Sequence, residues 1–204
     1  MTFHEPLNFY LQDPDVKLML AFQQGDKAAF EALMRKFYPR VLNFIFRMIA
    51  QRDTAEDLTQ EVFFRVYKSV ERYRPQAQIS TWVLTIARNL TLNELRRHQP
   101  AVSLDAPLMG EDGDMQRQLT DPRSVGADEE LIRQEKVEAI KEAIASLSEN
   151  QRTAVLLRRY EEFSYEQIAQ TMNLSVEAVK SLLSRAKENL KVNLRKYSKN
   201  NETF

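Results

Sequence analysis

The sequence predicts an all-α protein made of two small helical domains joined by a flexible acidic linker. Apolar residues recur at helical spacing along almost the whole chain, with little of the alternation typical of strands. Three of the four glycines and three of the seven prolines fall between residues 99 and 130. That segment carries eight acidic and two basic residues, a net charge of −6, and has no sustained helical period. We therefore expect domains at 15–98 and 130–197, with the linker at 99–129.

The first domain is expected to open with two helices. Apolar residues at helical spacing begin at Val16, and a second helix starts at about Lys27. Pro39 is expected near a helix break or in a first turn, because proline lacks the N–H that a helix interior needs. The segment 41–49 is apolar nearly all round, which predicts deep burial.

Two more helices should complete this domain. Asp53, with Glu56 three residues later, resembles a capping box at the start of TAEDLTQEVFFRVYKSVERY. Ser80 or Thr81 is expected to cap the next helix, TWVLTIARNLTLNELRRH. The inward residues expected on the first of these helices are Leu58, Val62, Val66 and Val70.

The second domain should contain four helices, beginning with LIRQEKVEAIKEAIASL. Ser148 with Gln151, and Ser164 with Gln167, are spaced as capping boxes for the second and third helices. Ser175 is expected to start the fourth helix.

Residues 164–183 indicate two short helices joined by a tight turn. Ala169 is small where the two helices would cross, and Asn173 tolerates the positive φ that such a turn requires. From Ser175 to Lys199 there are seven basic and two acidic residues, a net charge of +5. A cationic helix on a small packed support suits the major groove of DNA, although a hairpin with a solvated basic face remains an alternative. The residues expected to face outward are Lys180, Ser181, Ser184, Arg185 and Lys187.

The helix near residues 81–98 has a mixed polar face. An indole, amides and guanidinium groups together suit unstacked bases, which they hold by stacking and edge hydrogen bonds. A core tryptophan beside a solvated arginine face explains the same spacing. The residues of this face are Trp82, Arg88, Asn89, Asn93, Arg96 and Arg97.

The preceding helix carries an acidic face that ends in an aromatic ring. Paired carboxylates can bind metals or act as acid and base, but the chain has only two histidines and neither lies in a ligand motif. We therefore favour a docking patch for a protein partner, with a solvated acidic face as the alternative. The residues that could share this exposed face are Glu56, Asp57, Gln60, Glu61 and Phe64.

The composition also predicts what the protein lacks. With no cysteine there is no disulfide framework, thiolate metal site or cysteine nucleophile. No apolar run reaches the length of a membrane span, and no glycine-rich phosphate loop is present. We expect a cytoplasmic protein without membrane insertion that is not an enzyme, has no catalytic residues, and needs no cofactor or metal.

Three strings in order, DTAEDLTQEVFFRVY, STWVLTIARNLTLNELRR and SYEQIAQTMNLSVEAVKSLLSRAKENL, resemble bacterial extracytoplasmic-function (ECF, group 4) sigma factors of the sigma-70 family. The resemblance covers roughly residues 16–98 and 130–195. It implies two domains, region 2 and region 4, and a factor that binds core RNA polymerase and directs promoter-specific initiation. The implied partners are the β′ clamp coiled coil, the β flap, promoter DNA (duplex at −35, single-stranded at −10) and, in many relatives, an anti-sigma factor.

The resemblance also implies roles for the candidate residues. Asp57, Gln60, Glu61 and Phe64 match the helix that docks on the β′ coiled coil. Trp82, Arg88, Asn89 and Asn93, with the loop 73–80, match the positions that melt the −10 element and flip a base. Lys180, Ser181, Ser184 and Arg185 match the −35 contact positions, and Lys187 extends that basic face. The linker would thread toward the polymerase active-site channel.

Two departures from the family pattern concern specificity. Ser184 is small where many relatives carry a bulkier residue, and the loop RPQAQIST lacks the glycine or acidic residue often found there. Two other classes stay open from the residues themselves: a stand-alone helix-turn-helix regulator acting without polymerase, and a helical interaction protein or small metal enzyme.

Overall fold

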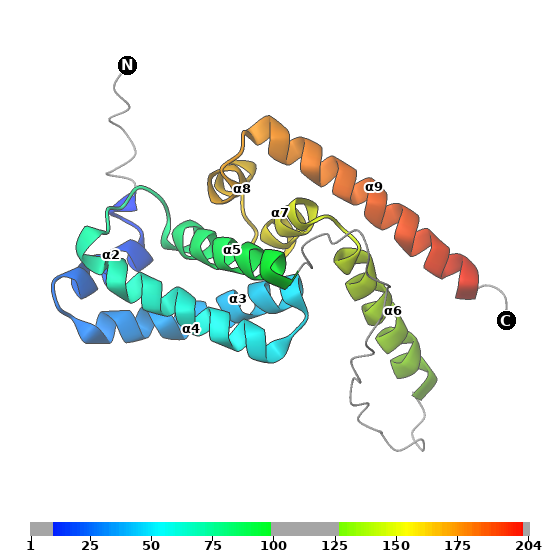
Figure 1. Cartoon of the computed structure of the whole chain (residues 1–204), viewed down its shortest axis with the longest axis horizontal. Coiled ribbons are helices and arrows are strands. Elements are labelled where there is room, and N and C mark those ends of the chain that lie inside the picture. Colours follow the sequence, from blue (N-terminus) through cyan, green and yellow to red (C-terminus); the bar gives the residue numbers. More distant parts are fainter. Residues whose placement is uncertain (1–9, 99–126, 202–204) are drawn as a thin grey trace.

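The computed structural model describes residues 10–98 and 127–201, and these residues form helices without any strand (Figure 1). The all-α prediction is confirmed. The predicted linker lies outside the described residues, except that the helix after it begins at Ala127. The elements are α2 (Pro14–Gln23), α3 (Lys27–Ile49), α4 (Arg52–Ser69), the 3₁₀ turn η1 (Val70–Arg72), α5 (Ile79–His98), α6 (Ala127–Ala145), α7 (Glu149–Tyr160), α8 (Tyr165–Met172) and α9 (Val176–Asn201).

The long helix α3 is the centre of the first helix group and packs against α2, α4 and α5. Pro39 lies inside this helix, so the break predicted there is wrong. A proline in a helix interior costs about 3 kcal/mol because one hydrogen bond is lost. Burial of apolar side chains on both sides of it, including Phe37 and Val41, outweighs that cost.

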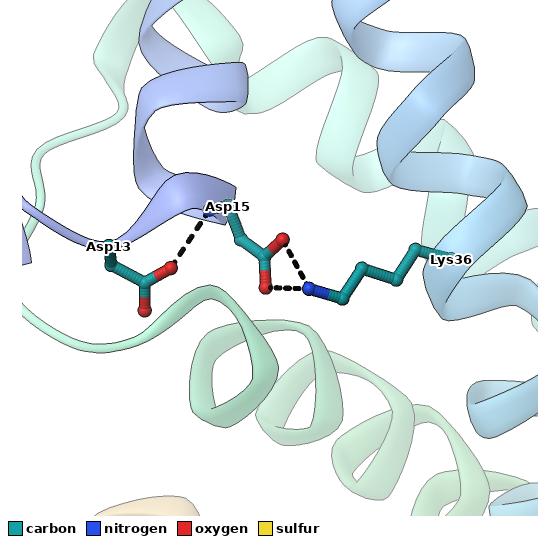
Figure 2. Close-up of polar contacts among 3 residues, drawn as sticks. All are labelled: Asp13, Asp15 and Lys36. Carbon is teal, nitrogen blue, oxygen red and sulfur yellow. Dashed lines mark hydrogen bonds and ion pairs between the residues drawn. The ribbon is translucent and has the colours of Figure 1, made fainter.

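Aspartates fix the starts of α2 and α3. Asp13 caps α2 by accepting a 2.8 Å hydrogen bond from the Asp15 amide, and Asp26 caps α3. Asp15 also pairs with Lys36 of α3, with Nζ and Oδ1 2.6 Å apart (Figure 2). The Asp13 cap and the Asp15–Lys36 ion pair together fix the start of α2 and its position against α3.

Two expected caps do not form. The N-cap of α4 is Gln51, and its side chain makes no capping bond; Asp53 lies within the first turn and Glu56 pairs with Arg52 at 2.9 Å. Helix α5 begins at Ile79, earlier than predicted, so that this isoleucine is buried in the core. Ser80 and Thr81 therefore lie inside the first turn of α5 and do not cap it.

The caps predicted in the second helix group are present. Ser148 accepts a bond from the Gln151 amide, and Ser164 forms a reciprocal capping box with Gln167. Asn173 ends α8 in the left-handed conformation, at φ 53° and ψ 52°. Ser175 accepts a 3.1 Å bond from the Ala178 amide at the start of α9.

Removing the α8 cap gives a direct test of this local structure. Ser164→Ala is expected to lower the free energy of unfolding by about 1 kcal/mol, because amide groups at the start of α8 lose their partner. Urea unfolding followed by circular dichroism measures this change. Ser181→Ala, at an exposed position on α9, is the matched control and should leave stability unchanged. Equal effects of the two substitutions would contradict the capping role.

The two helix groups share one continuous hydrophobic core. Helices α7 and α8 pack against α3 and α5, and α9 packs against α6, α7 and α8. Figure 1 shows α7 and α8 beside α5, with α4 on the other side of the first group and α6 and α9 extending away from it. The faces of α4 and α9 that carry the candidate residues therefore lie on separate parts of the molecule.

Candidate nucleic-acid interface

The turn between α8 and α9 holds a cationic helix against a small support. Ile168 and Met172 of α8 and Val179 of α9 are buried, so the two helices form a wedge. Cations and hydroxyls on an exposed helix can bind phosphate oxygens and base edges in a major groove. The five residues predicted on this helix, Lys180, Ser181, Ser184, Arg185 and Lys187, are all exposed.

The polar face of α5 is only partly assembled as predicted. Trp82, Asn89 and Asn93 lie on one face of α5, because they are seven and four residues apart, which is about two turns and one turn of helix. Arg88 lies about a third of a turn away from that face and is half-buried. Its Nη1 donates to Asn89 Oδ1 at 3.2 Å and its Nη2 reaches Asn150 Oδ1 of α7 at 3.4 Å. Burial is the main cause that lowers the Arg88 pKa, and the charge of Arg96 adds to it.

A cavity of about 470 Å³ lies where α5 meets the loop before it. The rings of Tyr73 and Trp82, with centroids 5.1 Å apart, form part of its lining. Thr81 lines it too, and the buried Tyr73 and Thr81 hydroxyls have no hydrogen-bond partner among the described residues. Burial, and secondly the charge of Asp13, raises the pKa of Tyr73 to about 12, so the phenol stays protonated. Unpaired hydroxyls beside two tilted rings suit a planar ligand with polar edges.

The acidic face of α4 is exposed but less negative than its sequence suggests. Asp57 and Gln60 are exposed, and Phe64 leaves 50 % of its surface accessible. Glu61 is half-buried and accepts a 2.7 Å bond from Arg65 Nε one turn later. Asp57 makes no ion pair within the described part of the chain, so it is the uncompensated charge of this face.

The aromatic end of the α4 face is also partly charged. Lys68 Nζ lies 4.2 Å from the centroid of the Phe64 ring, close enough for a cation–π contact. A depression of about 580 Å³ lies beside this ring, lined by residues of α4 and η1. The face therefore offers an exposed aromatic ring and one carboxylate without an ion pair, which suits a helical protein partner better than a metal.

A groove between α7 and α9 was not identified from the sequence. It measures about 760 Å³ and joins an apolar floor to a basic rim. Leu183, Leu190 and Leu194 of α9 line the groove and are spaced by seven and four residues. This helical periodicity is the feature of the sequence from which the groove could have been predicted. Lys187 belongs to the outward-facing set on α9 and also lines this groove, so it lies at the border between the two surfaces. The other lining residues are Val155, Arg158, Arg159, Glu162 and Lys191.

Neither metal ligation nor membrane insertion finds support in residues 10–98 and 127–201. No group of three or more His, Cys, Asp or Glu side chains gathers there in a way that could hold a metal ion. Among the same residues, no helix is both long enough and apolar enough to cross a bilayer.

Comparison with known proteins accounts for both helix groups. Residues 33–100 match Sigma-70 region 2, and residues 137–190 match Sigma-70, region 4. The chain is 32% identical over 180 residues to the RNA polymerase sigma-H factor of Pseudomonas aeruginosa, covering 87% of this chain and 92% of that protein. It is 31% identical over 179 residues to the ECF RNA polymerase sigma-E factor of Escherichia coli K12, covering 85% and 91% of the two chains.

Two solved structures share the fold. CnrH in complex with the cytosolic domain of CnrY has a TM-score of 0.64 at 19% identity, covering 89% of this chain and 97% of that one. The sigma factor RpoE in complex with the anti-sigma factor NepR from Bartonella quintana has a TM-score of 0.62 at 23% identity, covering 81% and 96%. At these identities the two structures support the fold alone.

The two matching family models and the relative at 32% identity show that the chain belongs to the sigma-70 family, a class of transcription initiation factors. Its curated relatives place it among the ECF-type sigma factors. It is accordingly a factor that directs the initiation of transcription by RNA polymerase.

Proposed function

We propose that this chain is a group 4 sigma factor whose three surfaces have separate tasks. Its regions correspond to 15–98 (region 2), 99–129 (linker) and 130–197 (region 4). The face of α4 docks on core polymerase, α5 with its preceding loop binds the −10 element, and α9 binds the −35 element. The observation that carries this proposal is that three exposed or hollowed surfaces of different chemistry lie on three different helices. The factor works in the cytoplasm and supplies binding rather than catalysis.

At −35 the basic face of α9 enters the major groove of duplex DNA. Lys180 and Arg185 are exposed cations that can bind phosphates or guanine edges, and Arg185 can make a bidentate contact. Ser181 and Ser184 lie beside them and can hydrogen-bond to either kind of group. The small Ser184 leaves room at its base step.

At −10 the cavity beside α5 receives an unpaired base. Trp82 is partly exposed and offers a ring face for stacking, while the buried Tyr73 ring and the unpartnered Tyr73 and Thr81 hydroxyls line the cavity beside it. Asn89 and Asn93 continue along the same face of α5 for the following nucleotides. Trapping unpaired bases in this way lets the factor assist melting without ATP.

Core polymerase is held at two places in this proposal. Asp57, Gln60, Glu61 and Phe64 contact the coiled coil of the β′ clamp. The groove between α7 and α9 holds a helix of the β flap, with leucines below and basic side chains at the rim. An anti-sigma factor is a further proposed partner, since one of the solved structures with this fold holds such a protein.

Promoter selectivity follows because one polymerase holds both weak DNA-binding surfaces, on α5 and α9, at the same time. Each surface alone has few contacts, and the local concentration supplied by the polymerase makes the second contact nearly intramolecular. A gel shift with a promoter fragment, with and without core enzyme, tests this dependence. Binding only in the presence of core supports a sigma factor, whereas tight binding without core would support a stand-alone regulator.

Arg185→Ala separates DNA binding from polymerase binding. We expect transcription from a cognate promoter to fall by about tenfold or more, since one base or phosphate contact is worth about 1–3 kcal/mol. Affinity for core polymerase should stay unchanged because Arg185 lies neither on α4 nor among the residues that line the groove between α7 and α9. Run-off transcription and a core pull-down measure the two effects, and equal losses in both would count against the assignment of α9.

A further inference from the structure

Helix α2 precedes the segment that matches Sigma-70 region 2, which begins at residue 33. It is nevertheless a fixed part of the first helix group. Val16 and Met19 are completely inaccessible to solvent, and Phe22 stacks on Phe30 of α3 with ring centroids 4.6 Å apart. Close packing of this kind holds a helix in one position, so a polar side chain at its end is also held in place.

Gln23, the last residue of α2, holds the turn η1 through its side-chain amide. Its Nε2 donates to the backbone carbonyl of Val70 at 2.8 Å, and to the carbonyls of Glu71 and Tyr73 at 3.3 Å each. Arg74 Nη1 donates to the Tyr73 carbonyl as well, at 2.9 Å. Carbonyls at the end of a helical segment lack intrahelical donors, and an amide nitrogen supplies donors where an oxygen would face three acceptors.

The backbone that Gln23 holds forms one wall of the cavity beside α5. The lining residues on this wall are Ser69, Arg72, Tyr73 and Arg74, and those on α5 are Thr81, Trp82 and Thr85. The two walls meet at Tyr73 and Trp82, whose ring centroids lie 5.1 Å apart with the planes inclined by 52°. A change in the backbone of η1 would therefore move Tyr73 relative to Trp82 and alter the shape of the cavity.

The two ends of α2 both act on Tyr73. The Tyr73 side chain is buried in the core, and α2 packs against η1. Burial is the main cause that raises the pKa of Tyr73, and the charge of Asp13, the N-cap of α2, adds to it. Gln23 holds the backbone of the same residue from the other end of the helix. Helix α2 thus supports Tyr73 although no residue of α2 lines the cavity.

We propose that Gln23 is a positioning residue for the −10 site: it holds η1 so that Tyr73 meets Trp82 in the geometry that accepts an unpaired base. The inference rests on the proposed function of the cavity beside α5. Gln23 does not contact the DNA in this proposal and acts only through the turn. Its hydrogen bonds fix the wall before the base arrives, so the cavity does not have to be ordered during melting.

Exchange of the donor for an acceptor tests this role. Gln23→Glu keeps the size of the side chain but places a carboxylate against three carbonyls. Opening at −10, measured by permanganate reactivity, should fall by about tenfold. Gln23→Met has a similar length without donor or charge and should lose opening in the same direction. Gln23→Lys offers only donors and should retain most of the opening.

Gln24→Glu is the matched control, because Gln24 is the exposed neighbour of Gln23 and receives the same charge at the same helix end. Opening by this variant should equal that of the wild type. Affinity for core polymerase should be unchanged in all four variants, since α4 and α9 are not altered. Melting curves from circular dichroism show whether each variant is folded.

Trp82 is the only tryptophan in the chain and reports the geometry of the cavity without polymerase. Gln23→Glu and Gln23→Met should change its fluorescence emission at a temperature where both are folded, whereas Gln23→Lys and Gln24→Glu should match the wild type. Unchanged Trp82 emission in Gln23→Glu and Gln23→Met would overturn the inference.

Two further results would also overturn it: equal opening by Gln23→Glu and the wild type, or equal losses in Gln23→Glu and either Gln24→Glu or Gln23→Lys. Failure of the proposed function gives a different result. In that case the wild-type chain would open no promoter with core polymerase, whether or not Trp82 emission responds to residue 23.

Discussion

Replacing Asp57 and Phe64 together by alanine is expected to lower affinity for core RNA polymerase by about 100-fold, or roughly 3 kcal/mol. Phe64 is the large apolar side chain on the α4 face and is half exposed, which is typical of an anchor residue. Asp57 is the carboxylate of this face that no ion pair offsets among the described residues. Glu61 should matter less, because Arg65 already pairs with it.

The loss can be separated from unfolding. Both side chains are exposed, so circular dichroism melting of the double variant should match that of the wild type. Glu56→Ala is the control on the same helix, because Glu56 pairs with Arg52 rather than standing free. Biolayer interferometry against immobilised core enzyme measures the affinities. Wild-type affinity of the double variant would remove α4 as the docking surface.

Trp82→Ala is expected to reduce promoter opening by up to about 100-fold, since stacking on an aromatic side chain is worth about 1–3 kcal/mol per base. Binding to core polymerase and to the −35 duplex should remain, because α4 and α9 are not altered. Permanganate reactivity of unpaired thymines at −10 measures opening, and run-off transcription measures its consequence.

Trp82→Phe is the matched variant for this prediction. Phenylalanine keeps a ring against Tyr73 and should retain most of the opening, whereas alanine removes the ring and also loosens the cavity wall. A melting curve for each variant shows whether the fold persists. If alanine and phenylalanine reduced opening equally, stacking by residue 82 could not be the cause.

Much of the fold was predictable because local chemistry determines it. The Ser164–Gln167 box, the Ser148 cap and the left-handed Asn173 each depend on residues within one turn. The errors arose where burial decided instead. Pro39 stays helical because its neighbours are buried, and α5 starts early because Ile79 enters the core.

The candidate surfaces were predictable as lists of residues but not as assembled sites. The outward set on α9 follows from helical spacing, and the structure shows all five residues exposed. The unpaired Tyr73 and Thr81 hydroxyls could be identified only from the structure, because a loop and a helix form their cavity together. Arg40 of α3 forms an ion pair with Glu161 at the end of α7, although the two residues are 121 positions apart and no local sequence pattern connects them.

The most direct measurement is the mapping of RNA start sites made by core polymerase on a library of genomic fragments, with and without this protein. Addition of the protein should create discrete new start sites whose upstream DNA shares two sequence elements at a fixed spacing, at −35 and −10. Start sites that are identical with and without the protein would contradict the central claim.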